Sequence, residues 1–169
     1  MRKLHILKAI VDFTWIFAIP LVMVIIAFIP AIFFYDFGDL NITINSINFN
    51  SVDSSMPLKL LLALNALNYL LIIYALYLFR RVLYFFLLVK VFDNKVIQLF
   101  NKIGYLLTIS GVVTLVLSFL SKLYFEQKMS LEFGLNPYIV IVCLGLFFMV
   151  LGEIFIVAKT AKQENDLTI

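Results

Sequence analysis

Four long stretches without a charged residue constrain this chain more than any other feature of its sequence. They cover residues 13–35, 60–79, 103–121 and 133–152, and each is 19 to 23 residues long. A helix rises about 1.5 Å per residue, so about 20 apolar residues cross the roughly 30 Å hydrocarbon core of a bilayer. The pattern therefore predicts four transmembrane helices.

The composition excludes other classes of protein. Of the 169 residues, 64% are hydrophobic and 14% are charged, against about 25% charged residues in soluble domains. So few charges cannot cover a soluble surface, and so apolar a chain does not stay disordered. The apolar runs are continuous rather than alternating, which favours helices over the strands of a membrane barrel. We expect an all-α integral membrane protein with a single four-helix domain over residues 1–169.

The basic residues predict the orientation of the chain. Ten of the 13 lysines and arginines fall near the N-terminus, between the second and third helices, and in the C-terminal tail, whereas the other two connections hold three. Because positively charged loops stay in the cytoplasm, both termini are expected there. The expected spans are about 13–35, 58–80, 103–122 and 136–158.

The same charges indicate which partners to expect. The bilayer itself is the first, and basic residues at its inner leaflet attract anionic lipid by about 1 kcal/mol each. Direct nucleic-acid binding needs a solvated basic face with elements that read a groove. The sequence offers no such face, so we expect no direct contact with nucleic acid.

The first outer loop, residues 36–57, contains two short stretches that alternate between apolar and polar residues, 41–45 and 47–50. Alternation with a period of two is a strand signal, so a small β-hairpin over the helix ends is expected. It is either a packed lid without a ligand or a sensor for a ligand or peptide, and the sequence leaves both open.

The connection between the second and third helices, residues 81–102, is expected to form a helical elbow on the cytoplasmic side. Residues 82–92 stay apolar without Gly or Pro, so the second helix outruns its span. Asp93 suits the N-cap of the next helix, which we expect to begin at about Asn94. Apolar residues then recur with the spacing of an amphipathic helix face: Val96, Leu99, Phe100 and Ile103. The elbow is the expected docking surface for lipid or a cytoplasmic partner.

Small and hydroxyl-bearing residues predict where the third and fourth helices pack. In membranes such residues let helix backbones approach closely. The third helix carries glycines and a series of hydroxyl residues spaced by four, and the fourth carries two glycines seven residues apart. The residues expected in this helix packing are Gly104, Ser110, Gly111, Thr114, Ser118, Gly145 and Gly152.

Four polar residues inside the spans or at their ends are functional candidates. Asn65 and Asn68 share a face of the second helix and form either an interhelical hydrogen bond or a polar binding pocket. Asp12 and Glu153 lie at the inner ends of the first and fourth spans, where ionisable groups are candidates by default. Salt bridges at the membrane surface are the simpler interpretation. The neighbouring cations are Lys8, Arg80 and Lys159.

The sequence offers little to support catalysis. One cysteine and one histidine exclude a disulfide framework and a Cys- or His-rich metal site. No nucleophile–base pair, metal-ligand spacing or glycine-rich phosphate loop stands out among its residues. We therefore expect no enzymatic activity, no cofactor and no bound metal.

The C-terminal tail is expected to be helical in part. The fourth helix should continue past Glu153 to about Gln163, because that stretch lacks Gly and Pro. Residues 164–169 are polar and acidic. They either fold back on the basic elbow, where opposite charges attract, or fray as chain ends often do.

Two stretches, residues 91–104 and 137–169, resemble the bacterial membrane proteins grouped as domain-of-unknown-function 2975. The likeness extends to the chain length and the four spans, and Glu153 matches an acidic residue in the family's last span. It implies a multi-pass protein of the bacterial inner (cytoplasmic) membrane without an established activity. Members are often encoded beside a small helix-turn-helix regulator, which implies a protein that tethers or inhibits such a transcription factor.

The resemblance places partner docking in the elbow and the tail, at Asp93, Lys95, Gln98, Glu164, Asn165 and Asp166. The leading hypothesis is a non-enzymatic interaction or signalling module. The alternative is a small transporter or a peptide-resistance protein of the immunity type, which would use Asn65, Asn68, Glu153 and the outer loop. A homo-oligomer is compatible with either.

Overall fold

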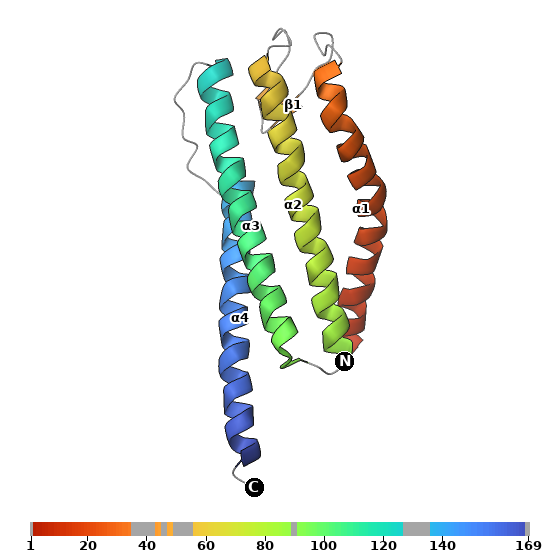
Figure 1. Cartoon of the computed structure of the whole chain (residues 1–169), viewed down its shortest axis with the longest axis vertical. Helices are drawn as coiled ribbons and strands as arrows, with labels where there is room; N and C mark the ends of the chain where they lie inside the picture. Colours follow the sequence, from red (N-terminus) through yellow and green to blue (C-terminus); the bar gives the residue numbers. More distant parts are fainter. Residues whose placement is uncertain are drawn as a thin grey trace.

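The protein is built from four long helices. The computed structural model describes residues 2–34, 43–44, 47–48, 56–88, 91–126 and 136–167. The helices are α1 (Arg2–Phe34), α2 (Met56–Leu87), α3 (Asn94–Ser121) and α4 (Pro137–Leu167). All four are long and apolar enough to cross a membrane. This confirms the predicted class, a helical membrane protein with four spans (Figure 1).

Shorter elements accompany the helices. A π-helical segment, η1 (Lys122–Glu126), continues α3. Strand β1 (Thr43–Ile44) pairs antiparallel with β2 (Ile47–Asn48), with Thr43 opposite Asn48. Most of the loop expected at 36–57 lies outside the described residues. Whether it forms a lid or a sensor therefore stays a prediction.

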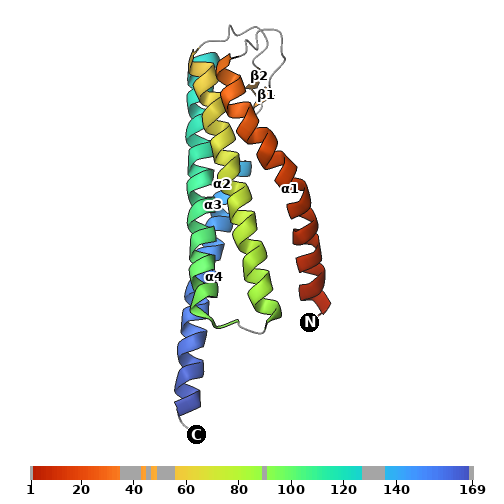
Figure 2. The same cartoon turned by 45° about the vertical axis from the view of Figure 1, so that its right-hand side comes forward.

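The helices pack mainly against their neighbours in the chain, α1 against α2, α2 against α3, and α3 against α4. Successive helices run in opposite directions, so both chain ends lie at the same end of the molecule (Figure 1 and Figure 2). We call that end, with Arg2, Leu167 and the α2–α3 connection, the terminal end. The opposite end, with Phe34 and Met56, is the loop end.

The α2–α3 connection is short and capped. Helix α2 ends at Leu87, and α3 begins at Asn94 as predicted. Asp93 has extended backbone angles, φ −71° and ψ 139°, and its Oδ1 accepts a hydrogen bond from the Lys95 backbone N–H at 3.0 Å. This is N-cap geometry, because the side chain satisfies a backbone donor that the helix itself leaves unpaired.

The main hydrophobic cluster lies toward the terminal end, between α2, α3 and α4. The predicted amphipathic face of α3 is buried in it, which confirms that prediction: Val96, Leu99, Phe100 and Ile103 are all at most 8% exposed. From α4, the Phe155 ring stacks on Phe100 with centroids 5.2 Å apart. Large buried rings contribute strongly to packing, so this contact ties α4 to the start of α3.

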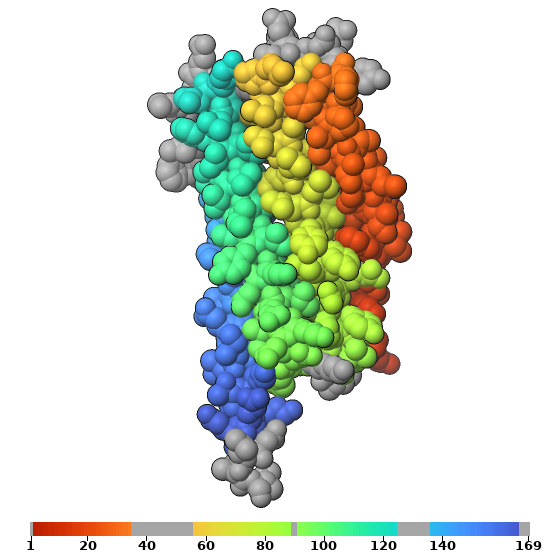
Figure 3. All heavy atoms as spheres, viewed as in Figure 1, coloured from red at the N-terminus to blue at the C-terminus, as the bar shows by residue number. Residues whose placement is uncertain are grey.

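Helix α4 is displaced along α3 toward the terminal end. Its first turn lies opposite the middle of α3, where a Cβ atom at Gly111 would be 2.9 Å from the Tyr138 carbonyl oxygen. Farther along, Lys159 Nζ donates a hydrogen bond to Asn94 Oδ1 at 2.6 Å. Because α3 begins at Asn94, the last turns of α4 extend beyond the other helices, as Figure 1 and Figure 3 show.

The C-terminal tail differs from the expected one. Helix α4 continues to Leu167, past the predicted end at about Gln163. The hypothesis that the tail folds back on the elbow is therefore wrong for residues 164–167, while 168–169 lie outside the described residues. The physical reason is that the sequence from Val157 to Leu167 contains neither of the residues that end helices, Gly and Pro.

Much of the helix surface is apolar and exposed. On α1, the buried residues are Val11, Ala18 and Ile32, whereas Phe13 and Met23 are 64% and 71% exposed. Such a surface is suited to lipid chains, because a helix satisfies its backbone polar groups internally.

Candidate functional site: the terminal end

Lysine and arginine side chains gather near the terminal end, on three adjacent helices. The charge-free stretch of α2 ends just before Arg80, and that of α3 begins just after Lys102. On α1 the corresponding stretch begins after Asp12, which contacts Arg80. The three stretches therefore end at one level of the molecule. The cations found there are Lys8, Arg80, Arg81, Lys95 and Lys102.

One group of these cations surrounds a depression of about 240 Å³ between α2 and α3, which we call the basic hollow. It is lined by Arg81, Phe85, Lys95, Gln98, Leu99 and Lys102. On α3, Lys95, Gln98 and Lys102 follow each other at intervals of three and four residues, so they share one helix face. All three are exposed. No acidic side chain is among the described residues that line it.

The N-cap at Asp93 positions this face. The cap fixes where α3 begins, and Lys95 and Gln98 follow within its first two turns. The opposite face carries Val96 and Phe100, which are buried against α2 and α4. The elbow thus combines an apolar face that anchors it with a basic face that stays open.

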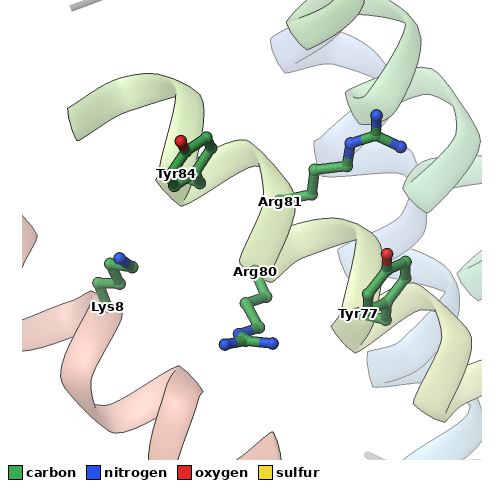
Figure 4. A pocket seen from close by; sticks show the side chains of 5 residues that line it. All are labelled: Lys8, Tyr77, Arg80, Arg81 and Tyr84. Atoms are coloured by element: carbon green, nitrogen blue, oxygen red, sulfur yellow. The ribbon is translucent and has the colours of Figure 1, made fainter. Parts of the chain in front are cut away.

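A second group of cations forms the basic cleft, a depression of about 410 Å³ beside α1 and α2. Lys8, Tyr77, Arg80, Arg81 and Tyr84 line it. Figure 4 shows Lys8 reaching from α1 toward α2, where Arg80 and Tyr84 lie. Arg81 borders both the cleft and the hollow.

Asp12 joins α1 to α2 beside the cleft. Its Oδ1 accepts from Arg80 Nε at 2.5 Å, and its Oδ2 lies 4.0 Å from Lys8 Nζ. The side chains of Asp12 and Arg80 are 33% and 40% exposed. This matches the simpler interpretation of Asp12, a salt bridge near the membrane surface.

Glu153 is placed differently from Asp12. Its side chain is exposed on α4, and within the described residues no ion pair involves it. Lys159, one of the cations expected near it, donates instead to Asn94. Gly152, the residue before Glu153, faces Asn101 of α3, one residue before Lys102. Glu153 therefore lies near the level where the charge-free stretches of the other helices end.

The two asparagines of α2 are buried and hydrogen-bonded. Asn65 Nδ2 donates to the Leu61 carbonyl of its own helix at 3.0 Å. Asn68 Nδ2 donates across to α3, to the Ser110 carbonyl at 3.3 Å and to Thr114 Oγ1 at 2.8 Å. Asn68 thus makes the interhelical hydrogen bond that was one of the two interpretations.

The expected packing of α3 on α4 needs a correction for the hydroxyl residues. Ser110 and Thr114 meet Asn68 of α2 rather than α4. Ser118 lies farther along, where its carbonyl accepts from Ser121 Oγ at 2.9 Å. The physical reason is that Ser110 and Thr114, four residues apart, share one stripe of α3, and at these two positions the stripe faces α2.

The glycines do lie between α3 and α4. A Cβ at Gly104 would be 2.8 Å from the Gly145 carbonyl oxygen, and a Cβ at Gly145 would be 2.8 Å from the Gly104 carbonyl oxygen. Gly111 faces Tyr138 and Val142, and Gly152 faces Asn101. Only a residue without a side chain allows the two backbones to approach so closely.

The docking candidates of the tail lie on the projecting part of α4. Glu164 and Asn165 are exposed, and Asp166 belongs to the last helical turn. The same part of α4 meets the elbow through Lys159, which binds Asn94, and Lys162, whose Nζ lies 5.7 Å from the centroid of the Phe92 ring. Helix α4 is thereby held against the start of α3 while its end projects.

The basic cleft is the feature that sequence reasoning missed. Its residues on α2, Tyr77, Arg81 and Tyr84, are spaced by four and three residues, which signals one exposed helix face. The sequence does not show that Lys8, some 70 positions earlier, completes the site. That follows from the pairing of α1 with α2.

Comparison with known proteins gives one result. The model of a protein family described as "Protein of unknown function (DUF2975)" matches residues 8–169. The curated proteins and the solved structures give no match. The family description names no activity, so the geometry of the terminal end has to carry the functional argument.

Proposed function

The chain belongs to the DUF2975 family, and on that premise we propose a non-enzymatic membrane module that docks a cytoplasmic protein at its terminal end. The observation that carries the proposal is the basic hollow. Three cations surround it, no acidic side chain is among its described lining, and its polar side chains are exposed. A surface of one charge sign attracts a partner of the other and orients it during association.

The orientation that this function requires is that the terminal end faces the cytoplasm. Both chain ends and the α2–α3 connection lie at that end, and they carry ten of the 13 basic residues. The positive-inside rule supports this assignment. The connection between α1 and α2 would then lie on the outer side, and the membrane would be the inner membrane of a bacterium.

The partner that fits the hollow is a protein with an acidic surface. The projecting end of α4 offers it a second contact (Figure 1), because the exposed Glu164 and Asn165 belong to the last turns of that helix. A small helix-turn-helix regulator is the partner that the family resemblance implies. Holding such a regulator at the membrane would keep it from its DNA, and this would be a signalling or inhibitory role.

Transport, the alternative, has less support from the geometry. It would need Asn65 and Asn68 to be available to a substrate, yet both amides donate hydrogen bonds within the protein. The bonds of Asn68 favour a structural role in joining α2 to α3.

The proposal is tested by measuring how tightly the full-length protein in detergent binds a purified helix-turn-helix regulator encoded beside its gene. The double variant Lys95→Gln/Lys102→Gln removes two cations of the hollow. Since each charge contributes up to about 1 kcal/mol at an exposed site, the affinity should fall by roughly tenfold. The control Arg2→Gln/Lys3→Gln removes two exposed cations from the same end of the molecule. Equal losses in both variants would refute docking at the hollow.

A further inference from the structure

We propose that the basic cleft between α1 and α2 binds the phosphate group of an anionic phospholipid from the leaflet at the terminal end. This site is separate from protein docking at the hollow, because the two share a single residue, Arg81. Three features of the cleft support this site: the donors that line it, its position at the ends of the charge-free stretches, and the apolar surface beside it.

The cleft presents more positive charge than its neighbourhood neutralises. Lys8, Arg80 and Arg81 line it, and within the part of the chain that the structure describes Asp12 is the acidic side chain that pairs with Lys8 and Arg80. Asp12 accepts a hydrogen bond from the Nε–H of Arg80, so the two terminal nitrogens of the guanidinium keep their N–H donors for a ligand. Planar guanidinium groups and lysine ammonium groups are the side chains that bind phosphate oxygens best.

Tyrosines complete the lining. Tyr77 and Tyr84 border the cleft on α2, and Lys8 Nζ lies 5.7 Å from the centroid of the Tyr84 ring. Figure 4 shows both tyrosines on the same stretch of α2 as the arginines. Their hydroxyls donate hydrogen bonds as well as accept them, so they fit the oxygens of a phosphodiester or a glycerol headgroup.

The position of the cleft along the helices matches the level of a lipid headgroup. The charge-free stretch of α1 begins after Asp12, and that of α2 ends before Arg80, so the cleft lies where both apolar surfaces stop. Trp15 packs on Tyr77 there, with ring centroids 5.3 Å apart. Tryptophan and tyrosine are enriched at the level of the headgroups.

The apolar surface next to the cleft gives a reason to favour a lipid over a free phosphate ion. One and two turns beyond Asp12 on α1, Ile16 and Ile19 are 63% and 49% exposed. A phospholipid whose phosphate sits in the cleft can lay its acyl chains along such a surface, whereas a soluble phosphate gains nothing from it. Basic pockets between transmembrane helices bind anionic headgroups in this manner.

The test is a lipid titration of the full-length protein in detergent, followed by native mass spectrometry. Phosphatidylglycerol is the probe, and phosphatidylcholine is the lipid control. The variant Lys8→Gln removes one cation of the cleft and should weaken phosphatidylglycerol binding about fivefold. Lys3→Gln on the same helix and Lys102→Gln in the hollow are the matched controls, each expected to change it less than twofold.

Three results would overturn the proposal. They are equal binding of the two lipids, equal losses in Lys8→Gln and Lys3→Gln, and displacement of phosphatidylglycerol by millimolar inorganic phosphate, which would assign the cleft to a soluble ion. Melting temperatures without lipid show whether each variant is folded, and Tyr84→Phe supplies a second variant that keeps the charge. This outcome is independent of the docking proposal, because docking at the hollow depends on Lys102 and not on Lys8.

Discussion

Arg80 of α2 donates from Nε to Oδ1 of Asp12 on α1, at 2.5 Å, where the charge-free stretches of both helices end. The contact joins two helices whose other packing is largely apolar. It also holds the guanidinium at the edge of the basic cleft. One ion pair therefore links the packing of α1 to the site at the terminal end.

Breaking this pair should loosen α1 slightly. Asp12→Asn removes the negative charge but keeps the size of the side chain. Because both partners are a third or more exposed, the free energy of unfolding should fall by no more than about 1 kcal/mol. The measurement is the free energy of unfolding in detergent. Asp12→Asn, Arg80→Gln and the variant with both changes form a double-mutant cycle. Additive losses in the cycle would show that the two side chains are not coupled.

Packing of α3 on α4 should be far more sensitive than packing of α1. Gly145→Ala places a Cβ atom 2.7 Å from the Thr108 backbone nitrogen and 2.8 Å from the Gly104 carbonyl oxygen. Backbone atoms cannot move aside cheaply, so stability should fall by about 1–3 kcal/mol. Ala161→Leu, which enlarges an exposed residue of the same helix, should have almost no effect. Equal melting temperatures for Gly145→Ala and the native protein would contradict the close approach.

The hydrogen bond from Asn68 should contribute measurably to the contact of α2 with α3. Asn68→Ala and Thr114→Val each remove one partner of the 2.8 Å bond. Coupling energies of this kind in membrane proteins average about 0.6 kcal/mol, and a double-mutant cycle measured by unfolding in detergent should give that order. Asn65→Ala should show no coupling to Thr114→Val, because the Asn65 side chain donates its hydrogen bond within α2.

Reporter fusions should assign the terminal end to the cytoplasm. Fusions after Lys95 and after Ile169 should report the cytoplasm, and a fusion after Ser51 should report the outside, since the lysines and arginines favour that orientation. Enzymes that are active on only one side of the membrane provide the readout. An outside signal after Ile169 would be incompatible with four crossings.

The sequence predicts the helices well because their determinants are local. Span lengths follow from the spacing of charges, and the start of α3 follows from the capping residue Asp93 and from the buried positions Val96 and Phe100. The displacement of α4 along α3 could not be predicted, because a uniformly apolar stretch fits a bilayer at several depths. It is set by the facing pair Gly104 and Gly145, which only the packed helices reveal.

The candidate site was predictable in part. Lys95 and Gln98 were candidates because of the family resemblance, and the structure places both on the lining of one depression. Periodicity places Ser110 and Thr114 on a common stripe of α3 but does not say which neighbour that stripe meets. The contact of Lys8 with Tyr84 is also invisible in the sequence, since the pairing of α1 with α2 brings the two side chains together.

The most direct test of docking at the terminal end is photo-crosslinking from Gln98, which is exposed between Lys95 and Lys102 in the basic hollow. A photoreactive residue there, in the full-length protein in its membrane, should crosslink to the helix-turn-helix regulator, and Lys95→Gln/Lys102→Gln should strongly reduce that product. A photoreactive residue at Tyr105, which is 61% exposed two turns farther along α3, should not crosslink to the regulator. Equal crosslinking from both positions, or a product from Gln98 that is undiminished by the loss of both lysines, would contradict the account.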